Sequence, residues 1–172
     1  MILNHATLIE RLNELGLNVK SIFDLVNSVK PYPQAIPVLI ESTESRDLDW
    51  KDVEGIVRAL AVQEAKGKAG RALIELFKRT PVDKILLKWA IGNTMDVVID
   101  KEELEDVLEI VQNKTHGIAR QMFVHALRRF RTEKVENVLM NPLDDPEVVA
   151  HAIYSLGCLQ SSQARKKIEV FL

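Results

Sequence analysis

The clearest chemical signal in the chain is a basic stretch that also contains two histidines. No acidic residue occurs between positions 114 and 131, where the basic side chains are Lys114, His116, Arg120, His125, Arg128, Arg129 and Arg131. Guanidinium and ammonium groups in this pattern could hold an acidic protein segment or the phosphates of a nucleic acid. The same run could equally be the solvated surface of a folded domain, so charge alone leaves both interpretations open.

Residues that could bind a metal or act as a nucleophile are few and scattered. His125 and His151 lie on separate predicted helices that could approach each other, and we interpret them as a surface pair rather than as a metal site. The single cysteine, Cys158, follows Gly157 at a predicted helix end, which suggests a small buried or half-buried side chain rather than a nucleophile. No phosphate-binding glycine motif is present. We therefore expect no catalytic residue, metal or cofactor, and no enzyme.

Two further groups of residues have a structural as well as a chemical interpretation. The acidic run "DKEELEDVLE" starting at Asp100 could supply paired carboxylates, but a solvated helix face is favoured because apolar residues occupy its other side. Trp89 could stack on a ligand, but its spacing from Val82, Ile85 and Leu86 predicts a core position. Trp50 begins a predicted helix, and its role stays open.

Helices must position these residues, because helical spacing recurs along the whole chain. One wide apolar stripe consists of Ile118, Ala119, Met122, Phe123, Ala126, Leu127 and Phe130. Strand signals are weak, since aromatic residues make up 5% of the chain and the hairpin dipeptides Asn-Gly and Asp-Gly do not occur. The fold class predicted from this pattern is all-α.

Helix boundaries have recognisable signals in the sequence. In "DDPEV", Asp145 is expected to cap a helix whose first residue is Pro146, and Gly157 is expected to end it. Thr80 and Pro81 repeat the same combination of cap and proline. Thr7 and Glu10 have the spacing of a capping box. These signals predict helices joined by short polar turns.

The helices recur as pairs. Four segments begin at Ala35, Gly70, Leu104 and Val135, and their leucines align at Leu39, Leu73, Leu108 and Leu139, with spacings of 34, 35 and 31 residues. Each segment precedes a second helix in which a small residue aligns, namely Ala59, Ala90, Ala126 and Ser155. Because one pair cannot bury its own apolar face, four pairs at this period predict a stacked α-solenoid.

Specific motifs in the second helices resemble a known repeat. "AIGNTMD" from Ala90, "SLGCLQS" from Ser155 and the turn in "PLDDPEVVAHAIYSLG" are similar to HEAT repeats, particularly the short bacterial type found in bilin lyases. The resemblance implies a right-handed superhelix of about four hairpins whose second helices line a concave, partner-binding face. Residues 1–32 would be N-terminal capping helices and residues 33–172 one continuous array that ends in a half-repeat.

A strip along the second helices is therefore the predicted partner-binding site. Its residues are Arg58, Lys88, Arg120, His125, Arg128, Arg129, His151 and Tyr154. The favoured function is a protein-interaction module, an adaptor, regulator or inhibitor, that binds a protein with an acidic segment. Alternatives are binding to a nucleic-acid backbone, as in HEAT-like DNA glycosylases, and a bilin-lyase-like enzyme. Reversing the charges of Arg120, Arg128 and Arg129 is expected to abolish binding without unfolding the protein.

Bulk properties limit the environment and the partners. The formal net charge of −2 provides no general attraction to nucleic acid or anionic lipid, so nucleic acid is disfavoured and no membrane association is expected. One cysteine and the absence of a signal-peptide pattern predict a cytoplasmic protein. At the C-terminus, Ala164, Ile168, Phe171 and Leu172 share a helical face. We expect this half-repeat to fold back in a monomer, with a dimer through it as the alternative.

Overall fold

The computed structural model describes residues 4–169, and every regular element in this range is helical. The α-helices are α1 (His5–Glu14), α2 (Phe23–Val26), α3 (Ile36–Ser42), α4 (Trp50–Ala59), α5 (Gly70–Arg79), α6 (Ile85–Val98), α7 (Leu104–Gln112), α8 (Gln121–Ala126), α9 (Glu133–Met140), α10 (Val149–Leu159) and α11 (Arg165–Ile168). The 3₁₀ helices are η1 (Pro33–Ala35), η2 (Gln63–Ala65), η3 (Lys101–Glu103), η4 (Lys114–Arg120), η5 (Leu127–Arg129) and η6 (Asn141–Asp144). The all-α prediction is confirmed for the described residues.

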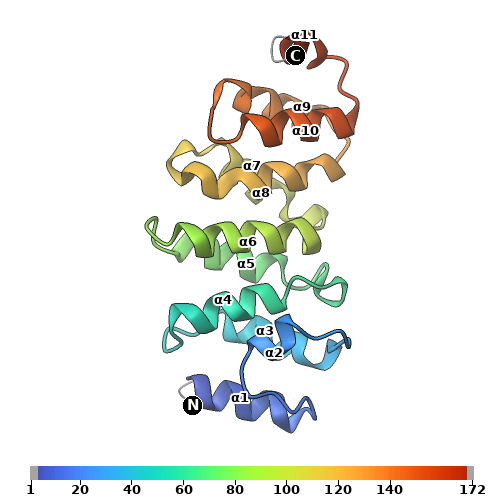
Figure 1. The fold of residues 1–172 in the computed structure, drawn as a ribbon. Coiled ribbons are helices and arrows are strands. Elements are labelled where there is room, and N and C mark those ends of the chain that lie inside the picture. The colour runs from blue at the N-terminus through green and yellow to red at the C-terminus, as the bar shows by residue number, and fades with distance from the viewer. Residues whose placement is uncertain (1–3, 170–172) are drawn as a thin grey trace.

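The helices are stacked in the order of the chain, with α1 at one end and α11 at the other (Figure 1). The pairs α3–α4, α5–α6, α7–α8 and α9–α10 occupy successive levels, and α4, α6, α8 and α10 lie on the side facing the viewer in Figure 1. These second helices contact one another in sequence: α4 contacts α6, α6 contacts α8, and α8 contacts α10. The turns that lead into α4, α6, α8 and α10 all lie along the left edge of this view.

Small residues and repeated leucines explain why the levels pack closely. Two sets of side chains are buried at the aligned positions, the leucines Leu39, Leu73, Leu108 and Leu139 and the small residues Ala59, Ala90, Ala126 and Ser155. Gly92 of α6 leaves little room for a side chain, because a Cβ there would lie 3.1 Å from Cβ of Met122 in α8. Hydroxyl groups also join neighbouring second helices: Thr94 Oγ1 donates to the Val57 carbonyl oxygen at 2.9 Å, and Ser155 Oγ donates to that of Val124 at 3.0 Å.

Short helices cover both ends of the stack. α1 packs on α3, and α2 packs on α4, where a Cβ at Gly55 would overlap Cγ2 of Ile22. At the other end Ala164 is fully buried and Ile168 packs against the core beside it. Phe171 and Leu172, which the predicted half-repeat also includes, lie outside the described residues. No helix within residues 4–169 combines the length and the apolar character needed to cross a bilayer.

Several helix boundaries differ from the predictions. α10 begins at Val149, three residues beyond the predicted Pro146, and continues past Gly157 to Leu159, after which Gln160 adopts a left-handed conformation with φ 58°. Thr80 does not cap α6, because its hydroxyl donates to the Leu76 carbonyl oxygen at 2.6 Å. In α1 the capping box consists of Asn4 and Thr7 rather than Thr7 and Glu10. Asp145 does accept the backbone N–H of Glu147, at 3.1 Å, but this bond caps the turn at residues 146–148 that precedes α10.

Candidate functional site

The eight residues of the predicted strip come from all four levels of the stack, but they do not form one exposed basic surface. Arg58 lies in α4, Lys88 in α6, Arg120 at the end of η4, His125 in α8, Arg128 and Arg129 in η5, and His151 and Tyr154 in α10. The structure places His125, Arg128 and Tyr154 close together, whereas Lys88 and Arg120 are buried. Arg58 forms its ion pair within its own helix, with Glu54 at 2.7 Å.

Lys88 is a structural residue rather than part of the surface, which corrects the prediction for this position. Its side chain is 2% exposed, and Nζ donates to the carbonyl oxygen of Phe77 at 2.7 Å and lies 3.9 Å from the Phe77 ring centroid. A helix would normally satisfy that carbonyl with the N–H four residues later, but that residue is Pro81, which has none. Lys88 therefore supplies the hydrogen bond that the Phe77 carbonyl oxygen at the end of α5 would otherwise lack. Burial lowers the pKa of its amino group.

Arg120 is likewise buried, at 1% exposure, and the prediction that it belongs to the surface strip is wrong. Nη2 bonds to Asp145 Oδ2 at 2.8 Å and to Glu147 Oε2 at 3.2 Å. The same guanidinium donates to the carbonyl oxygens of Gly117 at 3.0 Å and Val111 at 3.4 Å. Burial alone would raise the pKa of Asp145, but the hydrogen bonds from Arg120 and the Glu147 amide outweigh it and hold that pKa below its usual value.

Asp96 neutralises the basic residues that remain at the surface of α8 and η5. It forms a bidentate pair with Arg128, in which Nη2 lies 3.2 Å from Oδ2, and His125 Nδ1 lies 3.3 Å from Oδ1. The hydrogen bond to Asp96 raises the pKa of Arg128. Arg129 lies at the limit of this cluster, with Nη2 4.0 Å from Asp96 Oδ2. The predicted strip is therefore a mixed-charge surface, because an aspartate from the neighbouring level balances its arginines.

Aromatic side chains continue this surface onto α10. The rings of His125 and Tyr154 are stacked, with centroids 5.0 Å apart and an interplanar angle of 18°. Tyr154 is 55% exposed and His151 is half-buried. Burial and the neighbouring His125 lower the pKa of His151. Cys158 is exposed, contrary to the prediction that it is buried or half-buried, because α10 continues beyond Gly157.

A polar link crosses the same side of the stack nearer the N-terminal ends of the second helices. Trp89 is half-buried, and its Nε1 donates to Gln121 Oε1 at 3.3 Å. Gln121 in turn donates through Nε2 to the carbonyl oxygen of Glu147 at 2.8 Å. We define the second-helix face as the residues joined by these contacts, which are Trp89 and Asp96 of α6, Gln121, His125 and Arg128 of α8 and η5, and Tyr154 of α10.

The first turn of α6 is rotated relative to the prediction. Val82, Ile85 and Leu86, expected in the core with Trp89, are 69%, 44% and 76% exposed, while Leu87, Lys88 and Ile91 are buried. Trp50 and Ile118 are also exposed where the chain enters α4 and α8. These positions all lie in the turns before α4, α6 and α8 or in the first turn of α4 and α6. The apolar spacing alone predicted the wrong face of α6, because it did not anticipate that Lys88 would be buried while Leu86 is exposed.

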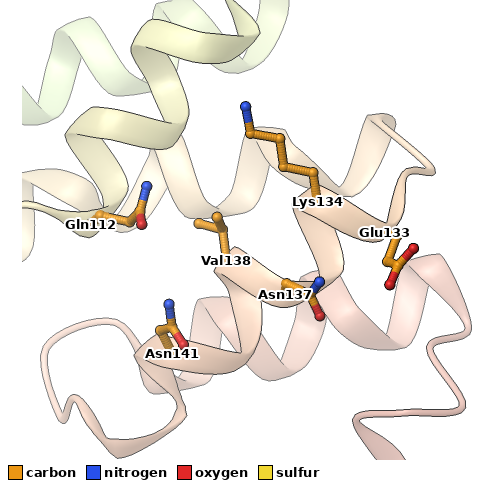
Figure 2. A pocket seen from close by; sticks show the side chains of 6 residues that line it. All are labelled: Gln112, Glu133, Lys134, Asn137, Val138 and Asn141. Atoms are coloured by element: carbon orange, nitrogen blue, oxygen red, sulfur yellow. The ribbon is translucent and has the colours of Figure 1, made fainter.

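A polar groove lies on the opposite set of helices, where the end of α7 meets α9 and η6. It has a volume of about 530 Å³ and is lined by Gln112, Glu133, Lys134, Asn137, Val138 and Asn141. Figure 2 shows these side chains spread along α9 and its flanks, with Glu133 at the end away from Gln112. All of them except Val138 are exposed, and Lys134 is paired with Glu105. The groove has the character of a solvated surface.

Within residues 4–169, no three His, Cys, Asp or Glu side chains are grouped so that they could hold a metal ion. His116 is a structural histidine: its ring packs edge-on against Phe77 at 4.9 Å, and burial lowers its pKa. The acidic run beginning at Asp100 forms η3 and α7, and its Asp106 pairs with Lys78 at 2.6 Å and Arg71 at 3.3 Å. These carboxylates link neighbouring first helices.

Comparison with protein-family models, with curated proteins and with solved structures finds no match for this chain.

Proposed function

We propose that this protein is a protein-interaction module that binds its partner through the second-helix face. The observation that carries the proposal is a pair of contacts that together span three successive levels: Trp89 of α6 bonds to Gln121 of α8, and His125 of α8 stacks on the exposed Tyr154 of α10. Tryptophan, tyrosine and arginine are the residues most enriched at protein-binding hot spots. Contacts between neighbouring levels hold these side chains in place, so little conformational entropy is lost on binding.

The partner that suits this face presents apolar or aromatic side chains together with a carboxylate. Tyr154 offers a ring that is backed by His125, and Arg129 is only weakly engaged by Asp96. An acidic segment would therefore contact Arg129 as well as Tyr154, rather than the whole predicted strip. The proposed partner is still acidic, as expected from the sequence, but its carboxylate would contact a smaller part of the surface.

A nucleic-acid partner is less well supported by the same geometry. Binding to a phosphate backbone requires several cations that are free to replace counterions. Lys88 and Arg120 are buried, and Arg128 is paired with Asp96. A protein partner remains the better assignment for this face.

We also propose that the stack is a right-handed α-solenoid of HEAT type. The support is the burial of the aligned leucines in α3, α5, α7 and α9 and the serial contacts among α4, α6, α8 and α10. In such an array each level buries the apolar face of its neighbour. The second helices would then form the inner, partner-binding side.

Site-specific photocrosslinking tests the proposed function. A photoreactive phenylalanine analogue at position 154 should capture a discrete partner, whereas the same analogue at Asn137 in the polar groove of Figure 2 should not. The affinity of the captured partner is then measured by calorimetry. Tyr154→Ala should weaken it by about tenfold or more, as expected for an interface hot spot.

Asn137→Ala serves as the matched control and should leave the affinity unchanged. Circular dichroism of each variant establishes that the fold is intact. Capture of the same partner from position 137, or an unchanged affinity of Tyr154→Ala, would contradict the proposal.

A further inference from the structure

A separate cavity lies at the edge of the stack, between the turn that joins α3 to α4 and the turn that joins α5 to α6. Its volume is about 500 Å³, within the range of small-molecule binding sites. We call it the edge cavity. Its apolar walls are Leu48, Trp50, Val53, Leu76 and Pro81, and its polar lining residues are Ser45, Arg46, Asp49 and Arg79.

The walls of the edge cavity reach the core. Leu48, Val53 and Leu76 are 8%, 3% and 1% exposed, so the cavity floor is formed by well-packed side chains. Trp50, by contrast, is 44% exposed at the mouth, where Lys84 Nζ lies 5.9 Å from its ring centroid. An aromatic or aliphatic group that enters the cavity would bury the exposed part of Trp50 and displace water from apolar walls.

Two arginines supply positive charge at this cavity without a paired carboxylate. Within the described residues, neither Arg46 nor Arg79 has an acidic group within 4.0 Å, although most other arginines of the stack are paired. Both arginines line the same cavity, and burial followed by the charge of Arg46 lowers the pKa of Arg79. Two guanidinium groups therefore flank one largely apolar cavity.

The carboxylates near this cavity are engaged elsewhere or remain at a distance. Asp49 accepts the backbone N–H of Asp52 at 2.8 Å as the N-cap of α4. Glu75 pairs with Arg71 at 3.3 Å. Glu44 and Glu75 influence the pKa of Arg79 through space, but neither approaches it within ion-pair distance. The charge at the cavity is therefore available to an incoming anion.

We infer that the edge cavity is a binding site for an apolar carboxylate, an anion whose acid group is attached to an aromatic or branched aliphatic body. The carboxylate would accept hydrogen bonds from Arg46 and Arg79, whose planar guanidinium groups suit bidentate contacts. The body would lie on Trp50 and Leu76. This inference does not depend on the proposed function, because the edge cavity shares no residue with the second-helix face.

Tryptophan fluorescence and amide NMR of the full chain test this site with 4-phenylbutyrate as the probe. In a Trp89→Phe background Trp50 is the only tryptophan, so its emission reports directly on the cavity. We expect saturable binding with a dissociation constant of about 1 mM or tighter, as for a small ligand of this size. The amide shifts should centre on residues 45–53 and 76–81.

Matched ligands and variants separate the contributions of charge and apolar area. The alcohol 4-phenyl-1-butanol and the short acid butyrate should each bind at least about tenfold more weakly than 4-phenylbutyrate. Arg46→Gln and Arg79→Gln should each weaken binding by about tenfold, because each removes a charge-assisted hydrogen bond. Lys78→Gln, on the same helix as Arg79 but outside the cavity, should have no effect, because Lys78 pairs with Asp106.

A peptide that ends in phenylalanine with a free carboxylate distinguishes the source of the natural ligand. Binding at least tenfold tighter than that of 4-phenylbutyrate, and lost on C-terminal amidation, would assign the site to a protein C-terminus. Weaker binding of the peptide would assign it to a free acid. Equal affinity for the acid and the alcohol, an undiminished affinity of Arg79→Gln, or shifts away from the cavity would overturn the inference.

Discussion

Arg120 connects its own turn to the end of α7 and to a turn that lies 25 residues further along the chain. One guanidinium binds Asp145, the Gly117 carbonyl oxygen and the Val111 carbonyl oxygen, so it joins the end of α7, the irregular turn of η4 and the turn before α10. Gly117 has a φ of 54°, a conformation that favours glycine. The arginine therefore fixes a turn with little regular hydrogen bonding of its own.

Removing this guanidinium should destabilise the protein strongly. Arg120→Ala leaves the buried carboxylate of Asp145 without its partner, which costs about 3–5 kcal/mol in the free energy of unfolding. Arg129→Ala, at a more exposed arginine that lies 4.0 Å from its nearest carboxylate, should change it by less than about 0.5 kcal/mol. Urea denaturation followed by circular dichroism measures both. Similar losses for the two variants would show that the buried ion pair has no special role.

The pH dependence of stability should report on Asp145. Its pKa is lower in the folded state than in the unfolded chain, so the unfolded chain binds more protons at low pH. The stabilisation is therefore present above about pH 4 and is lost as the pH falls through the folded-state value. Asp145→Asn should flatten this part of the urea-midpoint curve, whereas Asp144→Asn, at an exposed position, should not. Parallel curves for wild type and Asp145→Asn would contradict the assignment.

Residue environments were the least predictable part of the site. Lys88 and Arg120 have the charge of surface residues, and their burial depends on Pro81 seven residues earlier and Asp145 twenty-five residues later. A single helix pattern does not contain those distant partners. Tyr154 and His125 were correctly placed in neighbouring second helices, but their stacking required the structure.

At the scale of elements, glycine positions show which helix contacts are tight. Gly55→Ala should destabilise the protein by about 1–3 kcal/mol, because the new methyl group overlaps Ile22 and overpacks the contact between α4 and the segment before α2. Gly157→Ala is the control. Nothing lies within 4 Å of a Cβ at that site in α10, and higher helix propensity should stabilise the protein by up to about 1 kcal/mol. Thermal unfolding measures both variants, and the melting temperature should fall for Gly55→Ala and rise for Gly157→Ala.

Helix existence was predictable to a much greater extent than helix ends. The leucine spacing correctly located α3, α5, α7 and α9, because the aligned leucine of each helix lies on its buried face. The ends were misplaced where side chains took other partners. Asp145 binds Arg120 in addition to the Glu147 backbone N–H, and the Thr80 hydroxyl bonds to the preceding turn.

For the whole molecule, the C-terminal segment provides a test of how the stack ends. Deleting residues 162–172 removes Ala164 and Ile168 from the core surface of the last level, so the melting temperature should fall. We propose that the intact chain is a monomer whose terminal helix folds back, so light scattering should give the monomer mass before and after the deletion. A dimer that becomes a monomer on deletion would instead identify this segment as an interface.

The serial contacts of the stack have a consequence for how the protein opens. The helix pairs in closest contact are neighbours in the stack, so a terminal level can separate without disturbing the middle. Backbone amides of α6 and α8 should then exchange with solvent deuterium most slowly, and those of α1 and α11 most quickly. The proposed second-helix face begins on α6 and ends on α10, so amide protons at its α10 end should exchange faster than those at its α6 end. A partner that bridges them would extend slow exchange toward the C-terminal end.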